Sequence, residues 1–340
     1  MRCVLAGCGR MSRVWLESAA RIDGLEVVGL VDLDRAAARR QAAKHGLSGV
    51  AIGTDLARML RRTRADIVFD VVVPGARRSV VETALAHGCH VLSEKPMADS
   101  MDAARALVLA ARQAGRLHAV VQNRRYLAGV RRLKRFLGGS AVGKITALHC
   151  DFFLAPRFGG FREAMAHPLL LDMAIHTFDV GRLLAGAAAE TVYCAEWNPA
   201  GSWYANGASA VALFEFSGGA VFSYRGSWCA DGLRTSWEAQ WRIIGTTGTV
   251  LWDGHDSLRC EIYAAPPPKD EILATVEPIE IPPLDPHDRI GGHLGVMQDF
   301  CAAVQSGGEP ETVGHENINS LAMVFGAIDS AAARARLALA

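Results

Sequence analysis

Two short segments of this sequence carry side chains that can move protons, and the first is Glu94–Lys95–Pro96. It directly follows the apolar run at 89–93. Because a proline ring disfavours the helical conformation at the preceding residue, we expect Lys95 to be held extended where a buried strand ends. For an isolated motif of this kind, a surface salt bridge beside a strand-ending proline is the simpler interpretation.

The second segment, 167–186, is apolar almost all round and predicts a buried helix over 169–184. Asp172, His176 and Asp179 interrupt it, and at about 100° per residue all three project from one face. Buried carboxylates need partners, so these side chains form either a structural hydrogen-bond network or the wall of a pocket. An imidazole at such a place suits proton transfer near neutral pH.

The first third of the chain predicts the framework that would position Lys95. Short valine-rich runs alternate with segments of helical character, which is typical of a parallel sheet covered by helices on both faces. The expected strands are 2–7, 25–32, 66–73, 89–94 and 117–122, and the expected helices are 12–22, 34–45, 55–63, 77–88 and 100–114. Ligands of such sheets bind at the carboxyl ends of the strands, where Lys95 would lie.

The first strand-to-helix turn reads AGCGRMS, residues 6–12. Gly7 would allow a tight turn, Gly9 would let the backbone approach a pyrophosphate, and Ser12 stands where a third small residue packs helix against strand. This pattern alone is a weak signal for dinucleotide binding. Its place after a strand and before a helix strengthens it.

Asp32 ends the second expected strand at the spacing of a carboxylate that binds a ribose 2′-hydroxyl. The alternative is a helix N-cap, but Asp34 is the better candidate for that cap. An acid at this position repels a 2′-phosphate, so NAD is preferred. Arg35 and Arg39 leave NADP open as a second cofactor, because a nearby arginine can accommodate the phosphate.

Composition excludes several classes of function. The chain has 340 residues, 50% of them hydrophobic and 21% charged, and a formal net charge of +1, which argues against nucleic-acid and membrane partners. No apolar run approaches the roughly 20 residues of a membrane helix, and the first ten residues do not resemble a secretory signal. The eight cysteines form no C-x-x-C pair, so we expect reduced thiols, no metal site and a cytoplasmic protein.

The remainder of the chain predicts a second, strand-rich domain. Expected strands are 143–154, 191–197, 208–216, 220–228 and 237–245, with a hairpin turn at 217–219. One face of such a sheet needs a cover, so we expect a homodimer or homotetramer. Trp203 and Tyr204, in a loop, and Arg157, in the loop before the polar helix, are candidates for substrate contact, although large aromatics are more often core or interface.

Several motifs in their order along the chain resemble one family. They are SEKP at 93–96, QNRRY at 122–126, the D-x-x-x-H-x-x-D segment at 172–179, WRIIGTTGTV at 241–250 and the tail from Asp299. Together they resemble the glucose–fructose oxidoreductase/inositol dehydrogenase (Gfo/Idh/MocA) family over essentially the whole chain. The resemblance implies an α/β Rossmann domain at 1–122 and an α+β domain at 123–340 with a large, mainly antiparallel open sheet. It also implies a C-terminal helix, 315–338, that packs back toward the first domain.

The resemblance also implies roles for individual residues. Lys95, Asp172 and His176 match the family's catalytic residues. The cofactor-binding residues would be Gly7, Gly9, Arg10, Met11, Asp32, Val73, Pro74, Glu94, Lys95 and Asn123. The substrate-binding residues would be Lys95, Arg125, Tyr126, Arg157, Asp172, His176, Trp203 and Tyr204. The sequence departs from the family at VPGARRS, where Arg78 replaces a frequent histidine, and at AMAHPLL before the polar helix, which indicates an atypical substrate.

These assignments predict a dehydrogenase that transfers a hydride from a sugar or inositol-like polyol to NAD. His176 would take the hydroxyl proton, Asp172 would orient the substrate, and Lys95 would polarise the oxygen; the alternative makes a desolvated Lys95 the base. A second enzymatic hypothesis is a glycosidase that cycles bound NAD through transient oxidation at C3 and elimination. A third is a nucleotide-sensing protein without turnover, which would be expected to lose the lysine or the histidine.

Overall fold

The computed structural model describes residues 1–339, which form two compact units. The first unit consists of Met1–Tyr126 together with Arg289–Leu321, and the second consists of Leu127–Asp288 together with the segment from Ala322 on. Arg289–Leu321 thus returns to the first unit, whereas the predicted division placed all of 123–340 in the second domain.

The first unit is built on a six-stranded parallel sheet with the strand order β3-β2-β1-β4-β5-β6. The strands are β1 (Arg2–Ala6), β2 (Glu26–Val31), β3 (Ala51–Gly53), β4 (Ile67–Asp70), β5 (His90–Ser93) and β6 (His118–Val120). The five strands expected from the sequence are present. The sequence did not predict β3, because three residues are too few to show a pattern. The order reverses between β1 and β4, which is the doubly wound topology of dinucleotide-binding domains.

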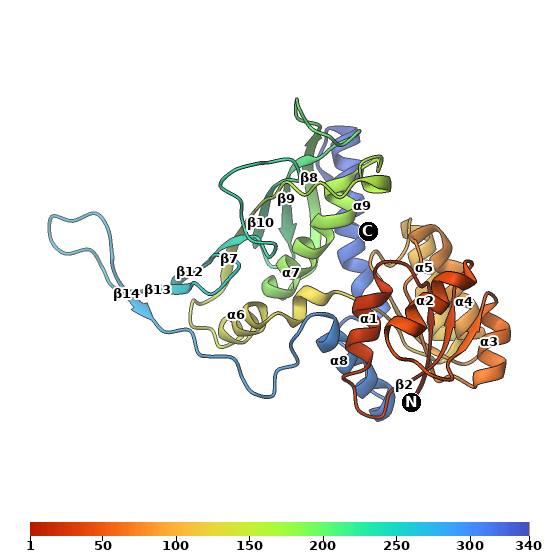
Figure 1. Ribbon diagram of the computed structural model, residues 1–340. Helices are drawn as coiled ribbons and strands as arrows, with labels where there is room; N and C mark the ends of the chain where they lie inside the picture. Colours follow the sequence, from red (N-terminus) through yellow and green to blue (C-terminus); the bar gives the residue numbers. More distant parts are fainter. Residues whose placement is uncertain (340) are drawn as a thin grey trace. The chain divides into compact units, whose positions relative to one another are not determined.

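Helices between the strands cover this sheet (Figure 1). They are α1 (Ser12–Ala19), α2 (Arg35–Lys44), α3 (Leu56–Thr63), α4 (Pro74–Ala86) and α5 (Met101–Ala114). Three begin at a side-chain cap: Asp34, Asp55 and Ser100 each accept a hydrogen bond from a backbone N–H of the first turn. Asp34 is therefore the N-cap of α2, as the sequence predicted.

A helix from late in the chain, α8 (His293–Ser306), completes the core of the first unit. Its buried side chains Val296, Met297 and Phe300 join the hydrophobic cluster that contains Trp15 of α1. The short 3-10 helix η1 (Asn123–Tyr126) follows β6 in the same unit. A core that includes residues 3 and 301 depends on contacts far apart in the sequence, which local patterns do not reveal.

The second unit is built on a nine-stranded sheet with the order β14-β13-β12-β11-β7-β10-β9-β8-β15. All neighbouring strands are antiparallel except β7 and β10, so the predicted mainly antiparallel sheet is confirmed. The strands are β7 (Ile145–Phe153), β8 (Ala189–Trp197), β9 (Ser209–Phe216), β10 (Val221–Ser227), β11 (Gln240–Gly245), β12 (Gly248–Trp252), β13 (Leu258–Ala265), β14 (Thr275–Ile279) and β15 (Leu337–Ala338).

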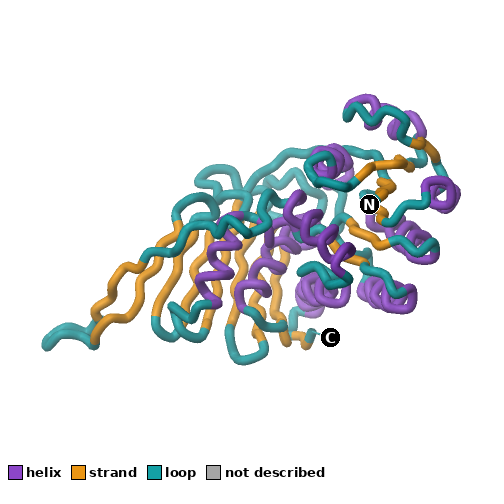
Figure 2. The backbone as a smooth tube through the Cα atoms, turned by 90° about the horizontal axis from the view of Figure 1, so that it is seen from below, coloured by secondary structure: helices purple, strands orange, loops and turns teal. Residues whose placement is uncertain are grey.

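Helices pack on one face of this sheet (Figure 2). They are α6 (Ala128–Gly138), α7 (Ile175–Ala185) and α9 (Gly314–Ala333), which begins in the first unit and ends in the second. Phe178 of α7 meets Phe214 and Phe222 edge-on, with ring centroids 4.8 and 6.3 Å away. These aromatic contacts join α7 to the strands beneath it.

The opposite face of the nine-stranded sheet is exposed over β8 and β9. Tyr193, Trp197, Val211 and Leu213 all show more than a third of their surface. Tyr193 pairs directly with Leu213 across the two strands, so these apolar side chains form one patch. Among residues 1–339, no helix has the length and apolar character needed to cross a bilayer. All eight cysteines are free.

Candidate active site

The glycine turn between β1 and α1 is shaped as dinucleotide binding requires. Gly7 has φ of 95°, and a Cβ there would lie 2.6 Å from the carbonyl carbon and oxygen of Val71. Only glycine fits such a place. A Cβ on Gly9 would meet nothing within 4 Å, so the space beside it is open. Ser12 is fully buried and donates to the Gly9 carbonyl over 2.6 Å, which fixes the turn at the start of α1.

Asp32 connects this turn to the end of β2. Its Oδ2 accepts the backbone N–H of Cys8 over 2.6 Å, and its Oδ1 accepts that of Asp34 over 2.8 Å. The carboxylate is therefore oriented from both sides beside the glycine turn. Arg10 and Met11 are exposed on the same turn. Val73 and Pro74, at the start of α4, are exposed as well.

Glu94 is the buried centre of a polar cluster just beyond β5. Its Oε1 accepts the indole N–H of Trp15 over 2.8 Å and lies 3.3 Å from Nε2 of His293, while its Oε2 accepts the backbone N–H of Lys95 over 3.1 Å. Burial by itself raises the pKa of Glu94, but the contacts with His293 and Trp15 and the charge of Lys95 outweigh it, so the pKa is lowered. The side chain is an ionised anchor at neutral pH.

Lys95 is half-buried and lies in a bend outside any helix. Its backbone is tied to Glu94, and the next residue, Pro96, is tied to the first turn of α4 through Arg77. Lys95 thus follows a strand whose carboxyl end lies at the same edge as the glycine turn and Asp32, because all these strands are parallel.

Arg77 is buried on α4 and pairs with Asp70, the last residue of β4, over 2.8 Å. Burial raises the pKa of Asp70, and the Arg77 guanidinium opposes that rise. Ser93 donates to the Asp70 carboxylate and lies 3.0 Å from Nε2 of His118. Three polar side chains on β4, β5 and β6 (Asp70, Ser93 and His118) and Arg77 of α4 therefore form one polar chain in the interior of the first unit.

The end of β6 offers amide groups to a ligand. Both polar side-chain atoms of Gln122 and Oδ1 of Asn123 are buried, and they have no hydrogen-bond partner within the part of the chain that is described. Buried polar atoms of this kind are normally satisfied, so they fit a bound polar group such as a nicotinamide or its ribose. With the open space at Gly9 and the acid at Asp32, the residues present fit NAD.

Two predicted substrate residues of the first unit are engaged in its interior. Arg125 is buried and donates to the carbonyl of Glu311 over 2.9 Å. Tyr126 is 1% exposed, and its hydroxyl donates to Asp299 over 2.7 Å. These contacts attach η1 to α8 and to the loop that follows it.

In the second unit, Asp172 and His176 lie on consecutive helical segments. Asp172 belongs to a π-helix, η3 (Pro168–Ala174), and His176 to the first turn of α7, both half-buried. The sequence predicted one regular helix over 169–184, and this is wrong for 169–174, which belong to the π-helix. Hydrogen bonds from i to i+5 widen the turn, so the 100° spacing does not apply through Asp172. Asp179 is buried and lies 3.9 Å from Arg182 on its own helix.

Arg162 is a partner of Asp172 that the sequence did not predict. Its Nε donates to Asp172 Oδ2 over 2.7 Å, and its guanidinium lies 5.2 and 4.9 Å from the ring centroids of Phe158 and Phe161. Arg162 comes from η2 (Gly160–Arg162), ten positions earlier. No spacing rule links a loop arginine to a helical acid at that distance, so the sequence carried no signal for the pair.

Arg157 belongs to one loop of the sequence and Trp203 and Tyr204 to another, but the three lie in one cluster. The Arg157 guanidinium lies 3.9 Å from the ring centroid of Trp203 and pairs with Asp231 over 2.7 Å. Tyr204 is 3% exposed, stacks on Trp228 and donates to the Pro156 carbonyl over 2.9 Å. Burial raises the pKa of Tyr204 to about 12, and the charge of Asp172 acts in the same direction.

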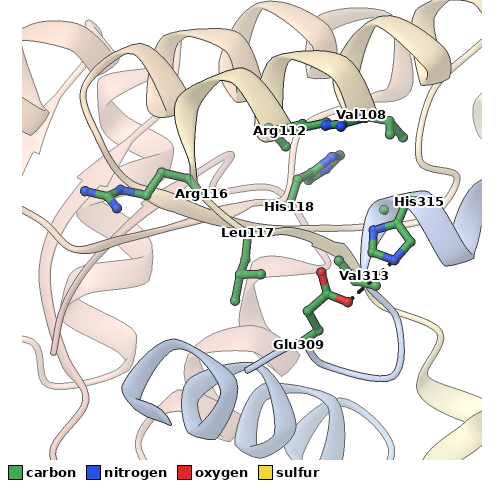
Figure 3. Close-up of a pocket in the computed structure, with 10 residues that line it drawn as sticks. Val108, Arg112, Arg116, Leu117, His118, Glu309, Val313 and His315 are labelled. Atoms are coloured by element: carbon green, nitrogen blue, oxygen red, sulfur yellow. Dashed lines mark ion pairs between the residues drawn. The ribbon is translucent and has the colours of Figure 1, made fainter. Parts of the chain in front are cut away.

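A separate cavity of ≈ 400 Å³ lies in the first unit between α5, β6 and the start of α9 (Figure 3). Its walls include Arg112, His118, Glu309 and His315, with Glu309 and His315 paired over 3.5 Å. None of the predicted site residues lines it. It opens at the amino end of β6, whereas the glycine turn and Lys95 follow the carboxyl ends of their strands, so it is not the candidate site.

Comparisons with known proteins agree with this arrangement. A family model described as an oxidoreductase family with an NAD-binding Rossmann fold matches residues 1–122, and a GFO/IDH/MocA C-terminal domain model matches residues 130–251. The chain is 32% identical to the uncharacterized protein y4oX of Sinorhizobium fredii, covering 90% of this chain and 85% of that protein. It is 27% identical to a D-apiose dehydrogenase of Paraburkholderia graminis, covering 94% of this chain and 84% of that enzyme.

A solved structure with the same fold is an oxidoreductase from Agrobacterium radiobacter in complex with NAD+, L-tartaric acid and magnesium. The two chains superimpose with a TM-score of 0.86 over 99% of this chain and 98% of the other, at 21% identity. At that identity the likeness establishes the two-domain fold.

Proposed function

Since this chain belongs to the Gfo/Idh/MocA family of oxidoreductases, we propose that it is an NAD-preferring dehydrogenase of a monosaccharide, a sugar derivative or an inositol-like polyol. It is an NAD(P)-dependent oxidoreductase that acts on a CH–OH group. The sugar class is supported by the similarity to the D-apiose dehydrogenase. A preference for NAD over NADP is supported by the carboxylate of Asp32 beside the glycine turn, which repels a 2′-phosphate.

The observation that carries the proposal is the carboxyl edge of the first sheet. The glycine turn follows β1, Asp32 follows β2, and Lys95 follows β5 one residue after an ionised, buried Glu94. A lysine whose backbone is fixed at the ligand-binding edge supports a functional role rather than that of a surface salt bridge. Bound NAD supplies the acceptor for the hydride that leaves the carbinol carbon.

In this proposal the chain's own residues bind the reacting hydroxyl group and accept its proton. Lys95 donates a hydrogen bond to the reacting oxygen and stabilises the negative charge that develops there. His176 accepts the hydroxyl proton, because an imidazole matches the acidity needed near neutral pH. In the alternative version of this proposal, Lys95 itself is the base.

Asp172 orients the substrate and is itself oriented by Arg162. Arg162 Nε donates to Asp172 Oδ2 over 2.7 Å, which fixes the carboxylate on that side. A sugar or polyol hydroxyl is a suitable donor to a carboxylate oriented in this way. Trp203 and the stem of Arg157 supply an adjoining surface for the C–H face of a ring.

The test is a panel of aldoses, sugar acids and inositols with NAD+ and NADP+, read by the absorbance of reduced nicotinamide. A dehydrogenase accumulates the reduced cofactor, whereas the alternative NAD-cycling glycosidase releases product without accumulation. Lys95→Ala should lower kcat about 100-fold or more while NAD+ still binds. A Lys95→Ala enzyme with full turnover would contradict the proposed role of Lys95.

We also propose that the exposed β8–β9 patch is covered by a second copy of the chain, giving a homodimer or homotetramer. Tyr193, Trp197, Val211 and Leu213 form a continuous apolar surface of the kind that interfaces bury. Leu213→Glu should shift the sedimentation coefficient toward that of the monomer. An unchanged oligomer would place the interface elsewhere.

A further inference from the structure

We propose that Arg77 is a positioning residue for Lys95: it holds the two loops that border the candidate cofactor edge and so fixes the lysine backbone. This inference rests on the proposed function for the role of Lys95. Arg77 itself touches neither the reacting oxygen nor the hydride acceptor in this scheme; it acts through the Lys95 segment.

The guanidinium of Arg77 donates three hydrogen bonds to two chain segments, 70–72 and the loop that contains Pro96. Nε donates to Asp70 at the end of β4 over 2.8 Å, and Nη2 donates to the carbonyl of Val72 over 2.7 Å. Nη1 donates to the carbonyl of Pro96. Since the side chain is 1% exposed, water does not compete for these bonds.

The two carbonyls that Arg77 binds belong to loops that follow neighbouring strands. Val72 lies two residues after β4 and directly before Val73 and Pro74, which are predicted cofactor contacts. Pro96 lies directly after Lys95, three residues beyond β5. One planar side chain therefore sets the spacing between the β4 loop and the β5 loop.

Asp70 and Ser93 fix the orientation of Arg77. Asp70 binds Nε through Oδ2 and the backbone N–H of Val72 through Oδ1, over 3.2 Å. Asp70 and Ser93 are register partners on β4 and β5, and the Ser93 hydroxyl donates to the Asp70 carboxylate. His118 Nε2 lies 3.0 Å from Ser93 Oγ. Because the Ser93 hydroxyl donates its proton to Asp70, His118 Nε2 is the donor in this second hydrogen bond. The network thus anchors the guanidinium to the sheet itself.

Lys95 is consequently held from both sides. Glu94 accepts its backbone N–H, and Arg77 holds the carbonyl of the following residue. Small displacements of a positioned catalytic group are costly in rate, because the reacting atoms must approach within a narrow range of distances. Loss of Arg77 therefore affects the chemical step more than the binding of substrate.

The experiment compares three variants of the full chain. Arg77→Met/Asp70→Asn removes both buried charges and keeps a carboxamide oxygen for the Val72 amide, so it avoids leaving one charge buried alone. Arg77→Lys keeps the charge beside Asp70 but cannot reach three acceptors. Arg105→Met is the matched control, because Arg105 pairs with Asp102 on the surface of α5.

Two readouts are measured on each variant: steady-state kinetics, and hydrogen exchange of the backbone amides over 94–98. For the double variant we expect kcat to fall about tenfold or more and the KM for NAD+ to change less than about threefold. Exchange over 94–98 should rise in the double variant and in Arg77→Lys. Arg105→Met should match the wild type in both readouts.

Folded Arg77 variants with wild-type exchange over 94–98, or with wild-type kcat, would overturn the inference. If the double variant does not fold, the same measurements on Arg77→Lys decide. The two proposals fail differently: turnover by Lys95→Ala refutes the function of Lys95, whereas unchanged exchange at 94–98 refutes the positioning by Arg77.

Discussion

The indole N–H of Trp15 donates to the carboxylate of Glu94 across 79 positions of sequence, over 2.8 Å in the buried interior of the first unit. This bond joins the helix after the glycine turn to the segment that carries Lys95. Trp15→Phe keeps an aromatic ring but leaves a buried, ionised carboxylate short of one donor. We expect the free energy of unfolding in urea to fall by about 1–3 kcal/mol.

Trp228→Phe is the matched control for Trp15→Phe. Trp228 is also 1% exposed or less, but within residues 1–339 its indole nitrogen has no hydrogen-bond partner. Its replacement removes similar volume without breaking a hydrogen bond, so the loss of stability should be smaller. Equal losses in the two variants would show that packing, not the bond to Glu94, accounts for the effect.

His118 makes stability depend on pH in a defined window. Burial lowers the pKa of His118 to about 3, and the charge of Arg77 acts in the same direction. An unfolded histidine titrates near pH 6.5, so below that pH the unfolded chain binds a proton that the folded chain does not. The free energy of unfolding therefore falls as pH drops from about 6.5 toward about 3, by up to about 1.4 kcal/mol per pH unit from this group.

His118→Phe should flatten that dependence, measured by urea unfolding at several pH values between 7 and 4. Glu94, whose lowered pKa gives a slope of the same sign at lower pH, is present in both proteins and cancels in the difference. His315→Phe is the control, because His315 is more than half exposed. Identical slopes in wild type and His118→Phe would contradict a neutral, buried His118.

The sequence predicted most of the fold because its signals are local. Valine-rich runs and the cap at Asp34 locate strands and helices without knowledge of their neighbours. The features that the sequence did not predict depend on contacts between distant residues or on irregular backbone. The three residues of β3 are too short for a period, and the π-helix at 168–174 has the composition of an ordinary buried helix.

The sequence predicted only those site residues that combine a suitable side chain with a fixed position after a strand. Gly7 and Asp32 follow strands at fixed spacings, so their places could be inferred. Arg77, Arg162 and His293 could not be inferred, because each acts on a partner that the fold, rather than the sequence, brings near. Nothing in the sequence indicates that Arg77 is buried on α4.

The charge of Asp32 is expected to set the cofactor preference. Asp32→Asn keeps an oxygen near the Cys8 amide but removes the repulsion of a 2′-phosphate. The ratio of NADP+ to NAD+ affinity, measured by calorimetry, should rise at least about tenfold, which corresponds to about 1.4 kcal/mol. Asp34→Asn changes the same charge two residues away at an exposed N-cap and should leave the ratio within about threefold of wild type. An equal rise in both variants would mean that net charge, and not Asp32 itself, discriminates between NAD+ and NADP+.

Arg162 is expected to matter for substrate and not for cofactor. Arg162→Met retains an apolar stem against Phe158 and Phe161 but removes the donor to Asp172. Since Asp172 then loses its orientation, kcat/KM for the sugar or polyol should fall about tenfold or more. The dissociation constant of NAD+ should stay at its wild-type value, because the residues that fit NAD belong to the first unit.

The control for Arg162 is Arg135→Met in the same unit. Arg135 pairs with Asp288 over 2.6 Å and with Asp285 over 3.5 Å rather than with Asp172, so its loss should leave kcat/KM unchanged. Arg162→Lys separates charge from geometry: a lysine supplies a cation but not the planar donor of Nε, and only partial recovery is expected. A folded Arg162→Met enzyme with wild-type kcat/KM would exclude Asp172 as the residue that orients substrate through this pair.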